Sequence, residues 1–205
     1  MTGQPLYKGV EKMFIRKATM EDLDRITELE ARCFPPAEAA SRERLAGRLA
    51  SYPEGFWLGF DDFRELICYA GGPVTREADL TDDMYENPEY HKKDGDWQMI
   101  FSVCTAPEQQ RQGLASIVLQ RVIRENKALG RKGVVLTCKE DKIHYYARFG
   151  FENEGVSDSV HGGAVWYQMR MTFDEEYAYE HMFDISDDPR ENKRMFEDAF
   201  WGSQC

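Results

Sequence analysis

Apolar residues in the first half of the chain recur at helical and strand spacings. Leu23, Ile26 and Leu29 are three residues apart, which predicts an amphipathic helix. Thr19 precedes this run as a suitable N-cap, and the double proline at 35–36 ends it. The other elements expected before residue 76 are a first strand at 14–18, a second helix at about 37–49, and a hairpin of strands at 55–60 and 66–71.

The second half of the chain alternates short apolar runs with helical stretches. A polar connection rich in Asp and Glu comes first, at 76–96, and its length indicates a functional or a mobile segment. The elements expected after it are a strand at 97–105, a helix at 113–129, a strand at 133–138, a helix at 140–149, a strand after Gly150 and a closing strand at 164–171. Strands that alternate with helices in this way predict an α/β fold.

The most informative chemistry lies between the strand at 97–105 and the helix that follows it. Residues 109–115 read Gln-Gln-Arg-Gln-Gly-Leu-Ala. Gly113 permits a positive φ and a close approach of backbone to a ligand. The first N–H groups of the helix lack internal partners and attract anions, above all phosphate. Neither the nucleoside-triphosphate loop nor the dinucleotide fingerprint is present. The turn therefore predicts a phosphate ligand, with an ordinary strand–turn–helix as the alternative.

A second motif follows one helix and one strand later. Residues 146–151 read Tyr-Ala-Arg-Phe-Gly-Phe, and Gly150 suits a helix C-terminus. This segment and the Gln-x-x-Gly-x-Ala pattern at Gln110, Gly113 and Ala115 resemble the two hallmarks of the GNAT superfamily of acyl-CoA-dependent N-acetyltransferases. The resemblance implies the GNAT fold, an α/β fold whose mixed twisted sheet has about six to seven strands flanked by about four helices. The expected parts are a leader at 1–11, the domain at 12–173 and an acidic, aromatic-rich extension at 174–205.

The same resemblance implies an acetyl-CoA co-substrate, no metal, and direct acetyl transfer to a primary amine in a ternary complex. An N–H near Val103 or Cys104 is expected to polarise the thioester carbonyl. Tyr146 matches the general acid of many GNAT enzymes, and the alternative is an aromatic ring that only packs. Arg148 is a candidate for a CoA phosphate or, equally, a solvated helix charge. The residues expected to hold acetyl-CoA are Val103, Cys104, Thr105, Gln110, Arg111, Gln112, Gly113, Leu114, Ala115, Ser116, Cys138 and Arg148.

Across residues 14–172 the chain is similar to the arylalkylamine N-acetyltransferases. That branch has His-x-His on the strand before the turn, whereas this chain has Met99 and Phe101. A base is still needed, because an alkylammonium with a pKa of about 10.4 must lose a proton before it attacks. The candidates are Glu30, Asp96, His144 and His161, and for each the alternative is a surface or structural residue. His161 is preferred as the catalytic base because its loop, between the last two strands, is placed to border the acceptor site.

Phe34 and Pro35 are expected to flank an aromatic or apolar amine substrate. The connection at 77–96 has eight acidic residues, which either attract a cationic amine or form a solvated loop. Two rival functions remain: acetylation of a protein N-terminus or lysine, and non-catalytic acyl-CoA sensing, which the missing histidines favour.

Composition limits the remaining possibilities. The net charge of −11 argues against nucleic acid as a partner. No apolar run approaches membrane-spanning length, and the five cysteines form no C-x-x-C pair, so we expect a reducing cytoplasm and no membrane partner. The extension at 174–205 has ten acidic and three basic residues together with many aromatics. We expect it to pack on the domain or on a second copy of the chain, as in a homodimer, and the alternative is a disordered extension.

Overall fold

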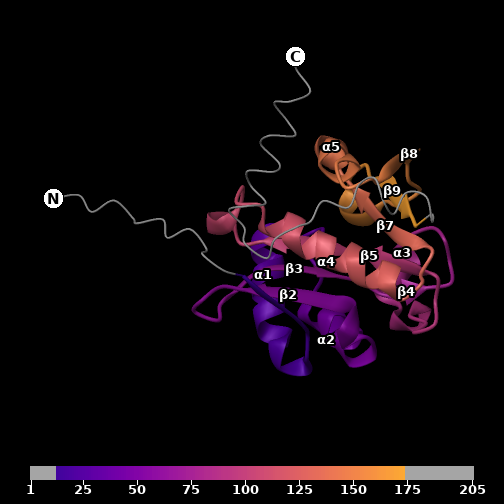
Figure 1. The fold of residues 1–205 in the computed structure, drawn as a ribbon. Helices are drawn as coiled ribbons and strands as arrows, with labels where there is room; N and C mark the ends of the chain where they lie inside the picture. The colour runs from indigo at the N-terminus through magenta and orange to yellow at the C-terminus, as the bar shows by residue number, and fades with distance from the viewer. Residues whose placement is uncertain (1–12, 174–205) are drawn as a thin grey trace, which may run out of the picture.

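The computed structural model describes residues 13–173, so the predicted leader and the predicted C-terminal extension lie outside the described residues. Within 13–173 the chain forms five α-helices and nine strands (Figure 1). In chain order they are β1 Phe14–Lys17, α1 Leu23–Cys33, α2 Arg42–Ser51, β2 Phe56–Phe60, β3 Leu66–Gly71, β4 Val74–Thr75, α3 Asp82–Glu86, β5 Trp97–Ile100, β6 Ser102–Thr105, α4 Leu114–Ala128, β7 Gly133–Cys138, α5 Ile143–Ala147, β8 Glu152–Val156 and β9 Tyr167–Thr172.

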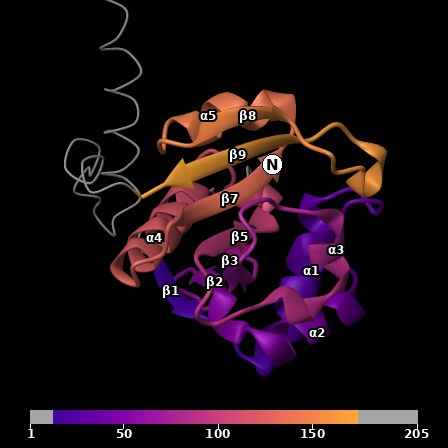
Figure 2. The ribbon, with the colours of Figure 1, turned by 90° about the vertical axis from the view of Figure 1, so that its right-hand side faces the viewer.

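The strands form two hydrogen-bonded sheets. One has the order β1-β2-β3-β6 and the other β4-β5-β7-β9-β8. Every pairing is antiparallel except that of β5 with β7, which is parallel and requires the crossover through α4. Figure 2 shows the strands stacked from β2 to β8, with α4 on one side and α1 and α3 on the other. This is the expected GNAT architecture, with its strands divided between two sheets.

Each face of the strands is covered by its own apolar core. The helix α4 places Ile117, Val118 and Val122 against one face. On the other face α1 and α2 bury Ile26 and Leu45 against β2 and β3. Since both faces are covered, the central strands are apolar throughout, and every residue of β3 is buried.

Four elements differ from the sequence prediction. The second helix begins at Arg42, because Ser41 is its N-cap and accepts from the Arg44 amide at 3.2 Å. The helix expected at 140–149 is a single 3-10 turn followed by the short α5. The connection at 76–96 contains α3, and the strand expected at 97–105 is interrupted at Phe101.

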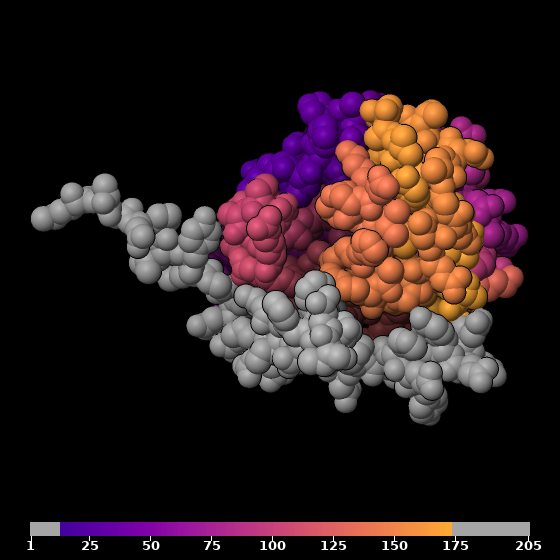
Figure 3. Space-filling view, turned by 90° about the horizontal axis from the view of Figure 1, so that it is seen from above, coloured from indigo at the N-terminus to yellow at the C-terminus, as the bar shows by residue number. Residues whose placement is uncertain are grey.

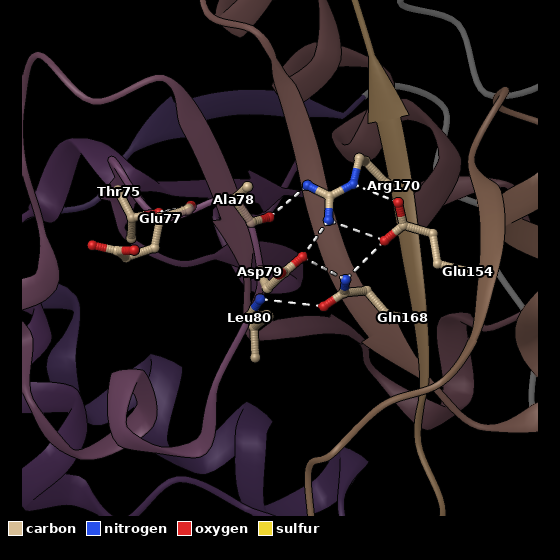
Figure 4. A network of polar contacts seen from close by, with 8 residues as sticks. All are labelled: Thr75, Glu77, Ala78, Asp79, Leu80, Glu154, Gln168 and Arg170. Carbon is tan, nitrogen blue, oxygen red and sulfur yellow. Dashed lines mark hydrogen bonds and ion pairs between the residues drawn. The ribbon is translucent and has the colours of Figure 1, made fainter.

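A polar network holds the connection before α3 against strands β8 and β9 of the second sheet (Figure 4). Arg170 of β9 donates to the Asp79 carboxylate at 2.5 Å, the Glu154 carboxylate at 2.7 Å and the Ala78 carbonyl at 2.5 Å. Gln168 donates to both carboxylates and accepts from the Leu80 amide at 3.3 Å. These contacts explain how an acidic segment lies against the sheet, and they place α3 beside the cavity described next.

None of the helices in residues 13–173 is long and apolar enough to cross a membrane.

Candidate active site

The site lies where the chain passes from β5 of the second sheet to β6 of the first. The parallel pairing of β5 with β7 ends at Ile100 opposite Leu136, and β6 pairs only with β3. The Phe101 amide donates to the Gly71 carbonyl at 2.9 Å, although Ser102 is the register partner of Gly71. Two residues therefore oppose one, which is a β-bulge that bends the strand. Beyond the bulge β6 and β7 separate and leave a cavity of about 270 Å³.

The backbone of β6 offers unpaired groups to this gap. The Ala106 amide donates to the Ile67 carbonyl at 2.8 Å, so that pair is hydrogen-bonded. Hydrogen-bonded and non-hydrogen-bonded pairs alternate along antiparallel strands. The amide of Cys104 consequently faces β3, whereas the amides of Val103 and Thr105 face away from it. Of the two N–H groups predicted to polarise a carbonyl, only that of Val103 is directed toward the cavity.

The polar turn before α4 has a strained backbone. Gly113 is the N-cap of α4 with φ of +81°, and Arg111 also has a positive φ of +63°. Residues of negative and positive φ follow one another here, with Gln112 between Arg111 and Gly113, and a turn of this kind directs successive backbone amides toward a common centre, as in anion-binding nests. A Cβ built on Gly113 meets no atom within 4 Å, so the space beside it is open.

Side chains around the turn divide between core and surface. Leu114 is 1% exposed and packs in the core under α4. Ser116 is also buried, and its hydroxyl lies 3.2 Å from that of Tyr145. Only the backbone amides of these two residues remain for a ligand at the turn. Gln110 and Arg111 are exposed, Gln112 and Ala115 are half-buried, and Gln112 donates to the Gln109 side chain at 2.9 Å.

Tyr146 lies at the opposite wall of the gap. Its side chain is 9% exposed and lines the cavity, where its ring meets Tyr145 and Phe151 edge-on. Burial raises the pKa of the phenol well above its ordinary value, so Tyr146 keeps its proton at neutral pH. Cys138 at the end of β7 also lines the cavity, and burial raises its thiol pKa to about 11.

Arg148 follows α5 and is exposed. Its guanidinium lies 5.1 Å from the centre of the Tyr145 ring, and Arg148 is not among the residues that line the cavity.

His161 closes the other side of the cavity. Its Nε2 lies 2.9 Å from the Glu38 carbonyl oxygen, which only accepts, so Nε2 carries a proton. In the neutral imidazole Nδ1 is then the basic nitrogen. The ring is stacked on Tyr85 with centroids 4.8 Å apart. The Trp166 indole fixes the loop by donating to the His161 carbonyl at 2.8 Å.

Glu30 is a buried carboxylate at the floor of the same cavity. It accepts from the Ala40 amide and the Ser102 hydroxyl at 3.1 Å, from the Cys104 thiol at 3.2 Å, and from the Tyr69 hydroxyl. Four donors satisfy the carboxylate without a cation. The sequence placed Glu30 on a helix but gave no sign of these donors, which come from three other segments.

Some of the remaining predicted residues line the cavity and others do not. Phe34 and Pro35 line the cavity, as do Phe101 and His161. His144 is exposed, Asp96 forms an ion pair with Lys132 at 2.9 Å, and neither lines the cavity. Met99 is fully buried in the core under α3.

The sequence analysis missed many of the lining residues, and among them are Arg48, Tyr85 and Trp166. For Arg48 a signal existed, because it interrupts the apolar stripe of Leu45 and Leu49 on α2.

Among residues 13–173 no group of three or more His, Cys, Asp or Glu side chains is arranged to hold a metal ion.

The surface seen in Figure 3 is hollowed between the rose-coloured middle of the chain and the orange segment that includes α5.

Comparisons with known proteins concern the family and the fold of the chain. A sequence model of the acetyltransferase (GNAT) family matches residues 23–151. The loading GNATL domain of CurA from Lyngbya majuscula superposes with a TM-score of 0.67 at 15% identity, covering 78% of this chain and 97% of that one. The ribosomal-protein-S18-alanine N-acetyltransferase from Escherichia coli has a TM-score of 0.60 at 16% identity, covering 83% and 99%. At these identities the likeness concerns the fold alone.

A curated relative, "Probable hydrolase YhcX" of Bacillus subtilis, is 24% identical over 153 residues. The aligned region is 67% of this chain but only 28% of that protein, so the chain spans little more than a quarter of its relative.

Proposed function

Because the chain belongs to the acetyltransferase (GNAT) family, we propose that it transfers an acetyl group from acetyl-CoA to the primary amine of a small molecule. The observation that carries the proposal is the gap between β6 and β7. The Val103 amide, which faces away from β3, and the protonated Tyr146 border the cavity there, and the turn before α4 follows β6 directly along the chain. An acyl-CoA thioester would use a carbonyl donor, a donor to its sulfur and a phosphate site, and these three features are suited to those roles.

Backbone groups hold the co-substrate in this proposal. The diphosphate of CoA binds to the amides at Gln112, Gly113 and Leu114, with Arg111 and Gln110 beside it, because unpaired N–H groups at a helix start favour anions. The pantetheine arm extends along the free edge of β6 past Thr105. The remaining backbone and side-chain contacts come from Ala115, Ser116, Cys138 and Arg148.

The reaction is a single displacement at the thioester carbonyl. The amine nitrogen forms the new N–C bond, and the C–S bond breaks to release a thiolate. The Val103 N–H donates to the carbonyl oxygen as negative charge develops on it. Tyr146 donates a hydrogen bond to the departing sulfur. An ordinary thiol has a pKa near 8.5, which is below that of the buried phenol, so the phenol keeps its proton beside the thiolate. Tyr146 therefore acts as a hydrogen-bond donor, and the bond is strong only while the thiolate charge is present beside it.

The proton of the attacking amine needs an acceptor. His161 fits this role through Nδ1, because the Glu38 carbonyl holds the proton on Nε2. Glu30 is less suited as the proton acceptor, because its carboxylate oxygens already accept hydrogen bonds from four donors. Met99 and Phe101 leave no histidine on the strand itself, so the base comes from the loop opposite.

The shape of the cavity favours a small acceptor over a peptide. The loop before α2 meets the loop before β9 through the Glu38 carbonyl and His161. It also meets the segment after β7, where Lys139 contacts the Glu38 carboxylate at 2.7 Å. A Cβ built on Gly162 lies 2.6 Å from the Glu38 side chain, which shows how closely the loops approach. A peptide needs a groove open at both ends. Phe34 and Phe101 support an acceptor with an apolar or aromatic body.

The test is acetyl transfer followed by thiol release, with acetyl-CoA and a panel of aromatic amines, amino acids, polyamines and peptides. We expect turnover with at least one small primary amine and none with peptides. His161→Asn should lower turnover by about 10²-fold or more while leaving CoA affinity unchanged in calorimetry. Tight CoA binding without turnover on any amine would refute the enzyme proposal and favour an acyl-CoA sensor.

A further inference from the structure

The acceptor half of the cavity contains a buried guanidinium that has no counter-ion among the residues that the structure describes. Arg48 is 4% exposed and lines the cavity from α2. Its only hydrogen bond among the described residues runs from Nη2 to the Tyr85 carbonyl at 2.9 Å. The Nε atom is buried and has no hydrogen-bond partner in the part of the chain that the structure describes. Nη1 also has no hydrogen bond within residues 13–173, and unlike Nε it is not sealed from solvent, so it is free to bind a ligand.

The other cations of the cavity are paired. Arg44, one turn earlier on the same helix, contacts Glu86 at 2.5 Å, and Lys139 contacts Glu38 at 2.7 Å. Lys142 pairs with Asp141. Arg48 therefore differs from its neighbours, because no carboxylate of residues 13–173 lies within 4.0 Å of it. A buried charge without a partner is costly, and a fixed Arg fork is suited to a planar anion.

The guanidinium is also held in place. It lies 4.8 Å from the centre of the Phe101 ring, and Phe101 in turn packs on Tyr85 at 4.5 Å. Tyr85 supports the His161 ring from its other side at 4.8 Å. Phe101 stands at one of the positions where the arylalkylamine N-acetyltransferases have a histidine. In this chain it supports Arg48 instead. A guanidinium fixed in this way loses little freedom when it binds a carboxylate.

We propose that the acceptor amine carries a carboxylate which pairs with Arg48, so that the substrate class is amino acids. This inference rests on the proposed acetyl transfer and names its substrate. Arg48 binds the carboxylate, the Phe101 and Phe34 rings contact the body of the acceptor, and the amine is directed toward His161 and the thioester. Arg48 is a specificity residue and takes no part in bond making.

The experiment compares kcat/KM for matched acceptors: amino acids such as phenylalanine, tryptophan and leucine, their methyl esters, and the corresponding decarboxylated amines. We expect the wild-type protein to prefer the free acids by about 10²-fold, as for a buried charge pair. Arg48→Met should lower kcat/KM for the acids by about the same factor and leave the amines within a few fold. Arg48→Lys, which keeps the charge but not the fork, should fall between them.

Arg44→Met is the matched control, because Arg44 lines the same cavity from the same helix but already has a carboxylate partner. It should leave the preference for acids intact. Thermal unfolding of Arg48→Met should show a folded protein, since the change removes an unpaired buried charge and keeps most of the side-chain volume.

The outcomes are distinct. Turnover of amines with no preference for the acids, or an equal loss for both in Arg48→Met, overturns the carboxylate inference and leaves the acetyl-transfer proposal standing. Failure to acetylate either class while CoA binds overturns both proposals.

Discussion

Substitutions in the turn before α4 can separate two effects, namely the cost of a left-handed backbone and the repulsion of a bound diphosphate. Gly113 and Gly130 flank α4, have φ of +81° and +69°, and have open space where a Cβ would lie. Any other residue at either position costs about 1–2 kcal/mol of folding free energy from the left-handed backbone. Gly113→Glu and Gly130→Glu should therefore lose similar stability, while only the first puts a carboxylate at the proposed diphosphate site.

The magnitude follows from electrostatics. Two unit charges about 5 Å apart at an effective dielectric constant of about 20 repel by about 3 kcal/mol. Since about 1.4 kcal/mol corresponds to a factor of ten in affinity, we expect Gly113→Glu to weaken CoA binding by at least about 10²-fold. Gly113→Gln adds the same bulk without charge, so it should weaken binding by a smaller factor.

The assay is calorimetric titration with CoA, combined with thermal unfolding of each variant. In a protein of this size each kcal/mol lowers Tm by about 2–4 °C, so the two glutamate variants should show equal, moderate decreases. If Gly113→Glu binds CoA as tightly as Gly130→Glu does, the diphosphate does not lie at this turn and the reasoning is wrong.

Three further changes probe other parts of the molecule. Tyr146→Phe should lower turnover by about 10²-fold or more without changing CoA affinity, because it removes only the donor to the leaving sulfur. Burial raises the pKa of Glu125, but hydrogen bonds from three donors outweigh it and lower this pKa to about 2. Its carboxylate therefore stabilises the fold above the ordinary pKa near 4.5, and urea unfolding should show a loss of up to about 3 kcal/mol as pH falls from 5 to 2, which Glu125→Gln lacks. Arg170→Met should cost about 1.5–3 kcal/mol and speed amide hydrogen exchange at 78–82.

Each of these has a control on the same scaffold. Tyr145→Phe removes a hydroxyl bonded to Ser116 and should keep near-normal turnover; an equal loss in both tyrosine variants would show that the ring only packs. Parallel acid curves for Glu125→Gln and wild type would contradict the carboxylate assignment. Arg76→Met breaks only an exposed pair with Asp94, so it should change stability by less than about 1 kcal/mol.

Much of the fold was accessible from local sequence. The three-residue spacing of Leu23, Ile26 and Leu29 predicted α1, and all three are buried. The hairpin of β2 with β3 and the strand β7 were also predicted with nearly correct ends. Apolar periodicity decides these elements because burial of one face stabilises each of them. The extension at 174–205 and its predicted packing stay predictions outside the described residues.

The interruption at Phe101 shows where local pattern fails. The sequence of residues 97–105 predicts one continuous strand, and nothing in it indicates that the two halves join different sheets. That division depends on which neighbours they pair with, β7 for the first half and β3 for the second. The gap that defines the site is a consequence of pairing between distant segments.

The sequence by itself determined the glycine turn, the tyrosine on α5 and the family to which both motifs point, because each depends on a few adjacent residues. Only the tertiary structure decided which amide of β6 is free, which candidate base reaches the cavity, and that Arg48 is buried without a carboxylate partner among residues 13–173. Those properties arise from α1, α2, β6 and the loop before β9 meeting in space, and no spacing along the chain records that meeting.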